Sequence, residues 1–356
     1  MQIVDNNTFK ILDTLSSHLG ASLSINQLTK KIKEKHGIGH YPSIYGKSHE
    51  LEKQGILTLE SFGKSSIIKL NFKNYLISDI LSEMEIQKKL EFLSNRKDLI
   101  ILFEEMEKSF SDICGIKSIC SIKPIKNIKL NRIEFLFLLG KINESSEYKL
   151  LTNKILAKLD TLQKKFNIKI DSFILDKQDF ISLIISDELN PLQEALLDKT
   201  AFFCPQAFWS ELREISEKTI IRPSEKNTRP IEISELDLIY NLNRFGYKEF
   251  GPRIEKGQKY RIEYIIMALL LKNSIRRIES IPIILSKNNF NSNLLIFLGQ
   301  KTGTSAKLLS LLKKLRDILS SEKIDYPIAL LENFDLEDIQ FDATGIAEKM
   351  SLYNAT

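Results

Sequence analysis

Residues 23–70 read LSINQLTKKIKEKHGIGHYPSIYGKSHELEKQGILTLESFGKSSIIKL, and the order of signals in this stretch decides the fold of the N-terminal part. Ser24 is a helix N-cap candidate, and the apolar residues after it recur at helical spacing up to a stop at Gly37. A second pattern of this kind begins near Tyr41 and ends at Gly55. The stretch therefore predicts two consecutive short helices.

The flanking residues extend this pattern on both sides. Upstream, apolar residues over 9–19 recur at helical spacing, and Gly20 follows as a helix stop. Downstream, residues 56–60 and 67–70 are short β-rich runs on either side of a Gly-containing turn at 62–66, which predicts a hairpin. The predicted order is three helices followed by a hairpin.

This order, with ELEKQGILTLES at positions 50–61, resembles the winged helix-turn-helix transcription regulators over residues 5–72. The resemblance implies a DNA-binding domain over residues 1–75, with the third helix in the major groove and the hairpin tip on the backbone or in the minor groove. We expect exposed side chains early in the third helix, at the tip and on the second helix to contact double-stranded DNA. They are Tyr41, Ser43, Tyr45, Lys47 and Ser48 on the third helix, Lys64 and Ser65 at the tip, and Lys31 on the second helix.

Charge is unevenly distributed along the chain. The first 75 residues contain ten lysines and six acidic residues, so +4 of the formal net charge of +5 lies in this part. A basic domain on a nearly neutral body is what a duplex-binding module would present. The same lysines also fit a solvated helix face, and winged helices also serve as protein-docking modules. Charge therefore leaves both DNA binding, which we favour, and protein docking open.

Residues 74–110 carry apolar side chains at helical spacing, with no proline or glycine among them. Helices directly after the hairpin often form the dimer contact in such regulators, and a two-fold dimer matches palindromic half-sites. Packing against the next domain would give the same pattern. We predict linker or dimerisation helices over 76–110 and favour a homodimer.

An alternation of strands and helices follows over residues 111–215. Strands are predicted at 116–122, 133–139 and 168–175, with helical patterns between and after them. This order resembles the small nucleotidyltransferase domain of the DNA polymerase β superfamily. Two stretches taken together are similar to the closing strand and helix of that family: KIDSFILDKQDFISLI, residues 169–184, and NPLQEALLDKTAFFCPQAFWSEL, residues 190–212.

The catalytic positions of that family are not retained. Lys123-Pro124 stands where the family has Gly-Ser, Arg132-Ile133-Glu134 stands where it has Asp-x-Asp, and Asp171 alone matches a family carboxylate. Two-metal phosphoryl transfer requires paired carboxylates, so we expect a degenerate domain with no catalytic residue, no metal and no cofactor. The region is basic instead. Its four cations either form a phosphate-binding group or lie in a solvated loop, and the sequence leaves both interpretations open. The four cations are Lys123, Lys126, Lys129 and Arg132.

The last third is predicted to be a polar linker over 217–231 followed by a helical domain over 235–335. Gly299–Ser305 lacks the spacing of a phosphate-binding loop, so we expect a loop and a helix N-cap there. The stretch RRIESIPIILSKN, residues 276–288, bears a short resemblance to the effector domains of AbiEi-type antitoxin regulators.

Motifs and composition further limit the classes of protein to which this chain can belong. The sequence contains no Ser-His-Asp, Cys-His or His-Glu-x-x-His arrangement and no dinucleotide fingerprint. His36 and His40 are four residues apart, but glycines interrupt any helix between them, which disfavours a metal pair. Three cysteines without a Cys-x-x-Cys pair fit a reducing cytoplasm. We recognise no signal peptide, and no apolar run approaches the roughly 20 residues that span a membrane.

The sequence therefore predicts an α+β multidomain protein of the cytoplasm that binds duplex DNA as a transcription regulator and is not an enzyme. Three alternatives stay open: an active nucleotidyltransferase, a component of an antitoxin system, and a winged-helix scaffold that docks proteins. Whether an effector ligand exists is also open.

Overall fold

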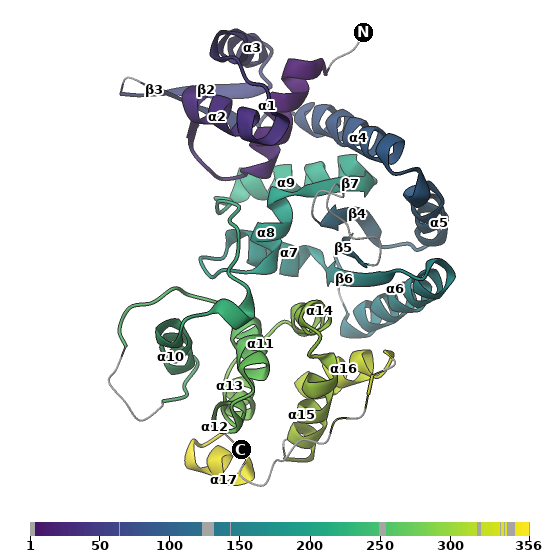
Figure 1. Cartoon of the computed structure of the whole chain (residues 1–356), viewed down its shortest axis with the longest axis vertical. Coiled ribbons are helices and arrows are strands. Elements are labelled where there is room, and N and C mark those ends of the chain that lie inside the picture. The colour runs from purple at the N-terminus through teal and green to yellow at the C-terminus, as the bar shows by residue number, and fades with distance from the viewer. Residues whose placement is uncertain are drawn as a thin grey trace.

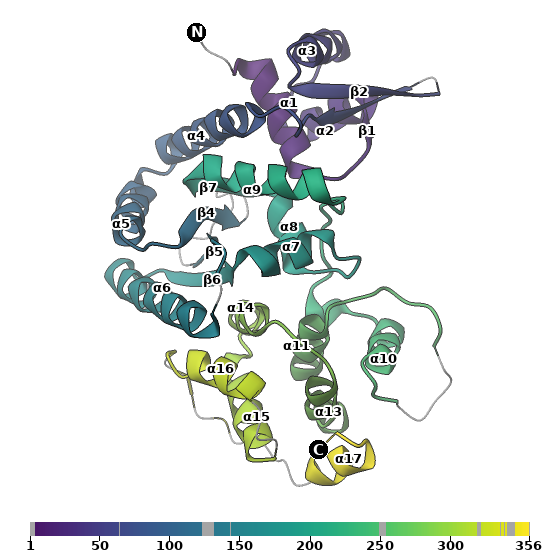
Figure 2. The same cartoon turned by 180° about the vertical axis from the view of Figure 1, so that it is seen from behind.

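In a computed structural model the chain is α+β and mostly helical, with two small sheets among the described residues (Figures 1 and 2). The structure describes residues 4–63, 65–122, 132–142, 144–248, 254–318, 322–334, 336–337, 339 and 346–355. Three parts follow one another along the long axis: the N-terminal unit (residues 4–75), the central unit (76–218) and the C-terminal helices (from 235 onward). No helix in these ranges has the length and apolar character needed to cross a membrane.

The N-terminal unit has the predicted three helices and hairpin. Its elements are α1 (Asn6–Ser17), β1 (Leu23–Ser24), α2 (Ile25–His36), α3 (Tyr41–Lys53), β2 (Leu57–Phe62) and β3 (Ser65–Leu70). Ser24 caps α2 as predicted, because its side chain accepts from the Gln27 backbone N–H while the Gln27 side chain accepts from the Ser24 N–H. The short β1 is a new element; it pairs with β3 and gives the sheet order β1-β3-β2.

The central unit is a mixed four-stranded sheet flanked by helices. Its elements are α4 (Ile77–Asn95), η1 (Lys97–Leu99), α5 (Ile100–Ser111), β4 (Ile116–Ile122), β5 (Arg132–Leu139), α6 (Ser145–Phe166), β6 (Lys169–Leu175), α7 (Lys177–Ile185), α8 (Pro191–Leu197), β7 (Lys199–Phe203) and α9 (Pro205–Lys218). The strand order is β6-β5-β4-β7, with β5 and β6 parallel and the other neighbours antiparallel. The three predicted strands are confirmed. Helix α4 packs along α9 and β7 of the same chain, which accounts for its inward apolar residues.

The C-terminal helices confirm the helical prediction for this part. They are α10 (Glu235–Arg244), α11 (Ile262–Lys272), α12 (Ile275–Ile278), α13 (Ser280–Lys287), α14 (Ser292–Thr302), α15 (Ser305–Ile318), α16 (Glu322–Leu331) and α17 (Ile346–Leu352). The prediction of a loop over Gly299–Ser305 was too long. Gly299 to Thr302 complete α14, which ends because Gly303 adopts a left-handed φ of 72°.

The sheet of the central unit is buried on both faces. On one face, Phe103 of α5 packs edge-on against Phe135 of β5 and Phe202 of β7. On the other face, Phe297 of α14 stacks on Phe173 of β6 with ring centroids 4.6 Å apart. The central unit and the C-terminal helices therefore share one core rather than forming separate domains.

Residues 219–229, predicted as a polar linker, lie against the protein and are called the connecting segment here. The backbone N–H of Ser224 donates to the Leu19 carbonyl at 3.1 Å, and that of Arg222 donates to the Ile184 carbonyl at 3.1 Å. The segment passes so close to Gly20 that an added Cβ there would lie 2.3 Å from the Ile221 carbonyl oxygen. It therefore connects the N-terminal unit to the central unit through hydrogen bonds.

A cluster of buried charges joins the same two parts; we call it the Asp13 cluster. The Asp13 side chain is 4% exposed and lies 2.8 Å from the Lys35 ammonium and 3.3 Å from that of Lys88. Lys88 of α4 is also 3.3 Å from the carboxylate of Glu85. Burial alone would raise the pKa of Asp13, but Lys88, Lys35 and a hydrogen bond from His36 hold it well below the usual value.

Lys199 of β7 completes the Asp13 cluster from the central unit. Its ammonium donates to the Ser16 carbonyl at 3.0 Å and lies 4.6 Å from the centre of the Trp209 ring. Burial lowers the pKa of Lys199 to about 8. The unfolded chain therefore binds more protons at this residue between about pH 8 and pH 10.5 than the folded protein does.

We expect the wild type to gain stability relative to a Lys199→Met variant as the pH rises from about 8 to 10.5, by up to about 3 kcal/mol. The gain follows because the free energy lost by burying the ammonium disappears as the group deprotonates. Urea unfolding of both proteins across this pH range measures the difference between their free energies of unfolding. The titration of every other group is common to both proteins and cancels in this difference. The exposed Lys154→Met variant is the control. A difference that stays constant with pH would contradict the prediction.

Candidate nucleic-acid interface

Helix α3 lies at the outer end of the N-terminal unit (Figure 1). Ile44 and Leu51 are buried on its inner face, where they contribute to the core of the unit. Tyr41, Ser43 and Tyr45 are exposed, as predicted. Tyr41 and Tyr45 present their rings and hydroxyl groups on the outer face, whereas the Ser43 hydroxyl accepts a hydrogen bond from the Asn7 side chain of α1 at 3.0 Å.

The aromatic side chains of α3 form a continuous row. Tyr41 and Tyr45 have ring centroids 5.8 Å apart, and Tyr45 meets His49 edge-on at 4.5 Å. The i, i+4 spacing places these rings on one helix face. Tyr41 and Tyr45 are 42% and 44% exposed, and Ile38, just before the helix, is 60% exposed. This row was not recognised as a unit from the sequence, although its spacing of four residues was visible there.

Lys47 is not the free cation that the sequence predicted. Its side chain is only 16% exposed, and its ammonium lies 2.7 Å from the Asp5 carboxylate and 2.9 Å from that of Glu50. Hydrogen bonds from Lys47 to Asp5 and then to Glu50 raise its pKa. A phosphate would have to displace two carboxylates to reach this ammonium.

The prediction that Ser48 is exposed is wrong, because the residue is fully buried. Ser48 follows Ile44 by four residues and precedes Leu51 by three, so all three share the inner face of α3. Ser48 therefore cannot contact a ligand on the outer face.

The hairpin of β2 and β3 projects from the N-terminal unit (Figures 1 and 2). Gly63 adopts a φ of 60° in its turn, a conformation that glycine adopts without strain. Ser65 is exposed beside this turn, as predicted, and Lys64 lies outside the described residues.

Lys31 points toward the central unit instead of toward solvent near α3. Its ammonium lies 2.9 Å from Nε2 of His18, and the two residues line a small hollow together with Asp198. The prediction that Lys31 is available to a DNA backbone is therefore corrected. Lys35 of the same helix is likewise held by Asp13.

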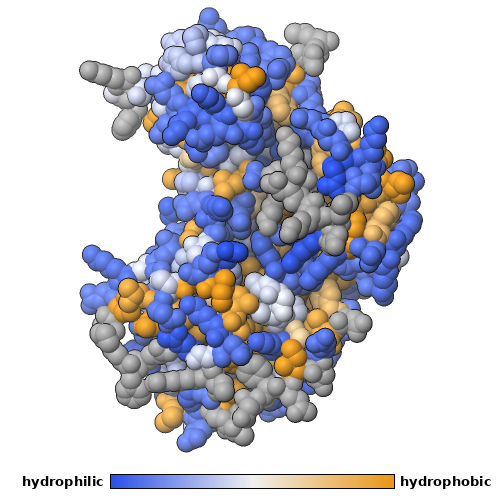
Figure 3. All heavy atoms as spheres, viewed as in Figure 1, coloured by the Kyte–Doolittle hydropathy of each residue, from blue (hydrophilic) through white to orange (hydrophobic). Residues whose placement is uncertain are grey.

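Other lysines of the N-terminal unit are better placed to bind phosphate. Lys33, Lys53 and Lys73 are exposed, and no carboxylate lies within ion-pair distance of them in the part of the chain that is described. Lys53 ends α3, and Lys73 follows β3. Figure 3 shows this end of the molecule as mainly hydrophilic, with only small apolar areas. Lys53 and Lys73 were not among the predicted contacts, because the residues around a lysine in the sequence do not show whether its ammonium is paired.

The basic group predicted in the central unit is only partly described. Lys123, Lys126 and Lys129 lie outside the described residues. Arg132 begins β5; its Nε donates to the Asp171 carboxylate, and its Nη2 donates to the Gln300 carbonyl at 3.1 Å. These guanidinium donors therefore bind the protein's own acceptors.

Two carboxylates lie side by side where the nucleotidyltransferase resemblance would place its catalytic site. Glu134 and Asp171 are register partners in the parallel strands β5 and β6. Asp171 pairs with Arg132, and Glu134 lies 3.1 Å from the ammonium of Lys301. Burial raises the pKa of Asp171, and the hydrogen bond from Arg132 opposes that rise. Each carboxylate is thus balanced by a cation of the chain itself, an arrangement suited to structure rather than to holding two metal ions.

The described residues contain no group of three or more His, Cys, Asp or Glu side chains that could hold a metal ion. Helix α3, the hairpin tip and the exposed lysines define the candidate interface by their own geometry. Compared with family models, curated proteins and solved structures, the chain matches none.

Proposed function

We propose that the N-terminal unit binds double-stranded DNA, with α3 in the major groove. The outward face of α3 carries the proposal. An α-helix with its side chains is about 10–12 Å across, and the major groove is about 12 Å wide. The hydroxyl groups of Tyr41, Ser43 and Tyr45 can donate to or accept from base edges and phosphates.

The order of elements supports this proposal. Helices α2 and α3 follow each other directly, the hairpin comes next, and β1 joins its sheet beside β3. This arrangement resembles a winged helix, in which the helix after the turn enters the groove and the hairpin lies against the backbone. Lys33, Lys53 and Lys73 then provide cations for phosphate contacts, in place of Lys31 and Lys47.

The other parts have supporting roles in the proposal. The central unit is a nucleotidyltransferase-like body without catalysis, because Arg132 and Lys301 balance its two carboxylates. A second copy of the chain would dock on the outer faces of α4 and α5, where Ile86, Leu90 and Ile101 are exposed. The protein would then act as a dimeric transcription regulator.

The test is fluorescence anisotropy of the full chain with a labelled random duplex across a salt series. We expect the logarithm of the binding constant to fall linearly with the logarithm of salt concentration, because phosphate contacts release counterions. A Tyr41→Ala/Tyr45→Ala variant should bind at least about tenfold more weakly. Lys53→Ala should reduce the salt slope by about one.

Two controls make the test specific to α3. Tyr75→Ala removes a tyrosine that is 72% exposed but lies outside α3, and it should leave binding unchanged. Lys47→Ala should have a smaller effect than Lys53→Ala, because Asp5 and Glu50 already balance Lys47. Absence of binding at low salt, or full binding by the double tyrosine variant, would reject the proposal. The row of Tyr41, Tyr45 and His49 would then be examined as a protein-docking surface.

A further inference from the structure

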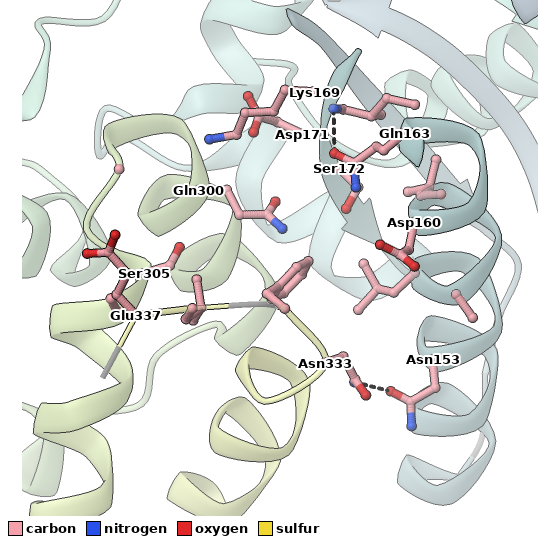
Figure 4. Close-up of a pocket in the computed structure, with 18 of the residues that line it drawn as sticks. Asn153, Asp160, Gln163, Lys169, Asp171, Ser172, Gln300, Ser305, Asn333 and Glu337 are labelled. Carbon is pink, nitrogen blue, oxygen red and sulfur yellow. Dashed lines mark hydrogen bonds between the residues drawn. The ribbon is translucent and has the colours of Figure 1, made fainter. Parts of the chain in front are cut away.

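A cavity of about 750 Å³ lies between the central unit and the C-terminal helices (Figure 4). Helix α6 and the strand β6 form one wall, and α14, the start of α15 and described residues between 333 and 339 form the other. The volume falls within the range of about 300–1,000 Å³ that is typical of small-molecule sites. The cavity is separate from the α3 surface, which lies at the far end of the molecule.

Strand β6 is an edge of the central sheet, and its backbone shows which residues face outward. In a parallel pair, alternate residues direct both backbone groups toward the neighbouring strand, and the residues between them direct both groups away from it. The N–H of Ile170 donates to Oε1 of Gln163 of α6 at 2.7 Å, so Ile170 faces outward. Ile174 does so too, since its carbonyl accepts from the Tyr148 hydroxyl of α6 at 3.4 Å. Ser172 lies between them and therefore directs its N–H and C=O outward.

The outward backbone groups of Ser172 lie at the cavity wall without a partner in the chain. Gln163, Ile170 and Ser172 all line the cavity, so the outward side of β6 is part of its wall. Among the described residues, no hydrogen bond from outside the sheet reaches the N–H or the C=O of Ser172. The residue is 6% exposed, and backbone groups at such burial are rarely left unpaired. This pair of groups therefore indicates a ligand with one acceptor and one donor.

The opposite edge of the same sheet shows how the protein otherwise satisfies such groups. In β7, the N–H of Ala201 donates to the carboxylate of Glu85 of α4 at 3.0 Å. The carbonyl of Lys199 accepts from the ammonium of Lys88, also of α4. Helix α4 thus supplies the missing partners along β7, whereas α6 supplies them along β6 only on either side of Ser172.

The rest of the lining indicates an uncharged ligand with an apolar body. Two of the four charged lining residues are paired within the protein. Asp171 pairs with Arg132, and Asp160 lies 2.7 Å from the ammonium of Lys164. The other two have opposite signs; they are Lys169 and Glu337. Apolar side chains contribute from both walls; they are Leu156, Leu159, Ile170, Phe334, Leu336 and Ile339. The wall thus carries no excess of either charge that would favour an ionic ligand.

We propose that this cavity binds an uncharged small molecule with an apolar body and a primary amide or lactam group. Such a group presents a carbonyl oxygen and an N–H side by side. Its carbonyl would accept from the Ser172 N–H and its N–H would donate to the Ser172 C=O, as a neighbouring strand would. In Figure 4, Gln163 lies beside Ser172, and its amide N–H groups can add a donor because Oε1 already accepts from Ile170. The proposal does not rest on the DNA-binding function, and either can fail without the other.

Ligand-observed NMR titration of the full chain with matched pairs of compounds tests this proposal. The pairs are benzamide with N,N-dimethylbenzamide, and caprolactam with N-methylcaprolactam. Methylation removes the N–H donors and keeps the carbonyl and the ring. We expect saturable binding of at least one N–H compound, and its methylated partner should bind at least about tenfold more weakly.

Variants of the wall locate the binding. Ala157→Trp places a large side chain on the cavity wall and should abolish saturable binding. Lys154→Trp changes an exposed residue of α6 that does not line the cavity, so it should bind like the wild type. Ser172→Pro removes the outward N–H and spares the pairing with β5, since an edge strand tolerates proline whose nitrogen faces outward. It should weaken binding at least about tenfold, whereas Ser172→Ala keeps the N–H and should stay within about twofold of the wild type.

Circular dichroism must first show that Ser172→Pro is folded. If it is not, Ala157→Trp and the methylated compounds decide. Three results would each overturn the proposal: no saturable binding of benzamide or caprolactam, equal binding of each N–H compound and its methylated partner, or undiminished binding by a folded Ala157→Trp or Ser172→Pro variant.

Discussion

Replacing Asp13 by asparagine is expected to destabilise the protein by about 3–5 kcal/mol. The substitution keeps the size of the side chain but removes the negative charge between the ammonium groups of Lys35 and Lys88. Lys88, whose side chain is 15% exposed, would then be held in a largely buried site without this carboxylate, and the more exposed Lys35 would lose its ion-pair partner. Such a loss exceeds the value of an ion pair on the surface, because water cannot solvate the remaining charges.

Urea unfolding measures this change conveniently, because Trp209 is the one tryptophan of the chain and lies beside Lys199 in the Asp13 cluster. Asp98→Asn is the matched control; its carboxylate is 44% exposed and pairs with Arg96, so its loss should cost no more than about 1 kcal/mol. In a Lys88→Met background the Asp13→Asn change should lower the free energy of unfolding by less, because one of the two ammonium groups that lose their carboxylate partner is already absent. Equal costs for Asp13→Asn and Asp98→Asn would contradict the role given to the cluster.

The second large effect is expected at Gly20, where Gly20→Ala should cost about 3 kcal/mol or more. Two physical terms contribute. The φ of 75° is strained for any residue with a Cβ. The new methyl group would also lie 2.3 Å from the Ile221 carbonyl oxygen and 2.8 Å from the Arg222 carbonyl carbon. Both are backbone atoms, so the connecting segment itself must move.

Gly37→Ala separates these two terms. Gly37 has a φ of 78°, but no atom lies within 4 Å of an added Cβ, so only the backbone strain of about 1 kcal/mol applies. Thermal and urea unfolding of both variants therefore isolate the contact with the connecting segment. Trypsin digestion should also cut the Gly20→Ala variant faster after Lys226 in the connecting segment. If the two variants lose the same stability, the segment does not pack against Gly20 in solution.

Elements with local signals were predictable from the sequence. The capping residues Ser24 and Gln27 fix the start of α2, and Gly37 ends it with a left-handed φ. The strand β4 was predicted with its observed bounds, 116–122. The strand β7 was not predicted as a separate element, because five residues between two helices carry no clear alternation. Its partner β4 is distant in the sequence, so only tertiary pairing defines it.

The candidate interface was only partly predictable. The outward direction of Tyr41 and Tyr45 follows from helical periodicity, and the same periodicity would have placed Ser48 inward beside Ile44. Pairing of charges was not accessible, because Asp5 reaches Lys47 and His18 reaches Lys31 from other helices or their caps. The cavity lined by Asp171, Gln300 and Ser305 joins distant parts of the chain, so no local pattern could reveal it.

The buried junction between the N-terminal and central units has a consequence for spacing along a duplex. The Asp13 cluster and the connecting segment hold α3 at one orientation relative to the sheet, with no free tether between them. Under the proposed function, two copies joined through their central units would hold their two α3 helices at a fixed distance and a fixed relative rotation. B-form DNA repeats every 10–10.5 base pairs or so. Half-sites moved apart by roughly half a turn would therefore face opposite sides of the duplex, and one dimer could reach only one of them.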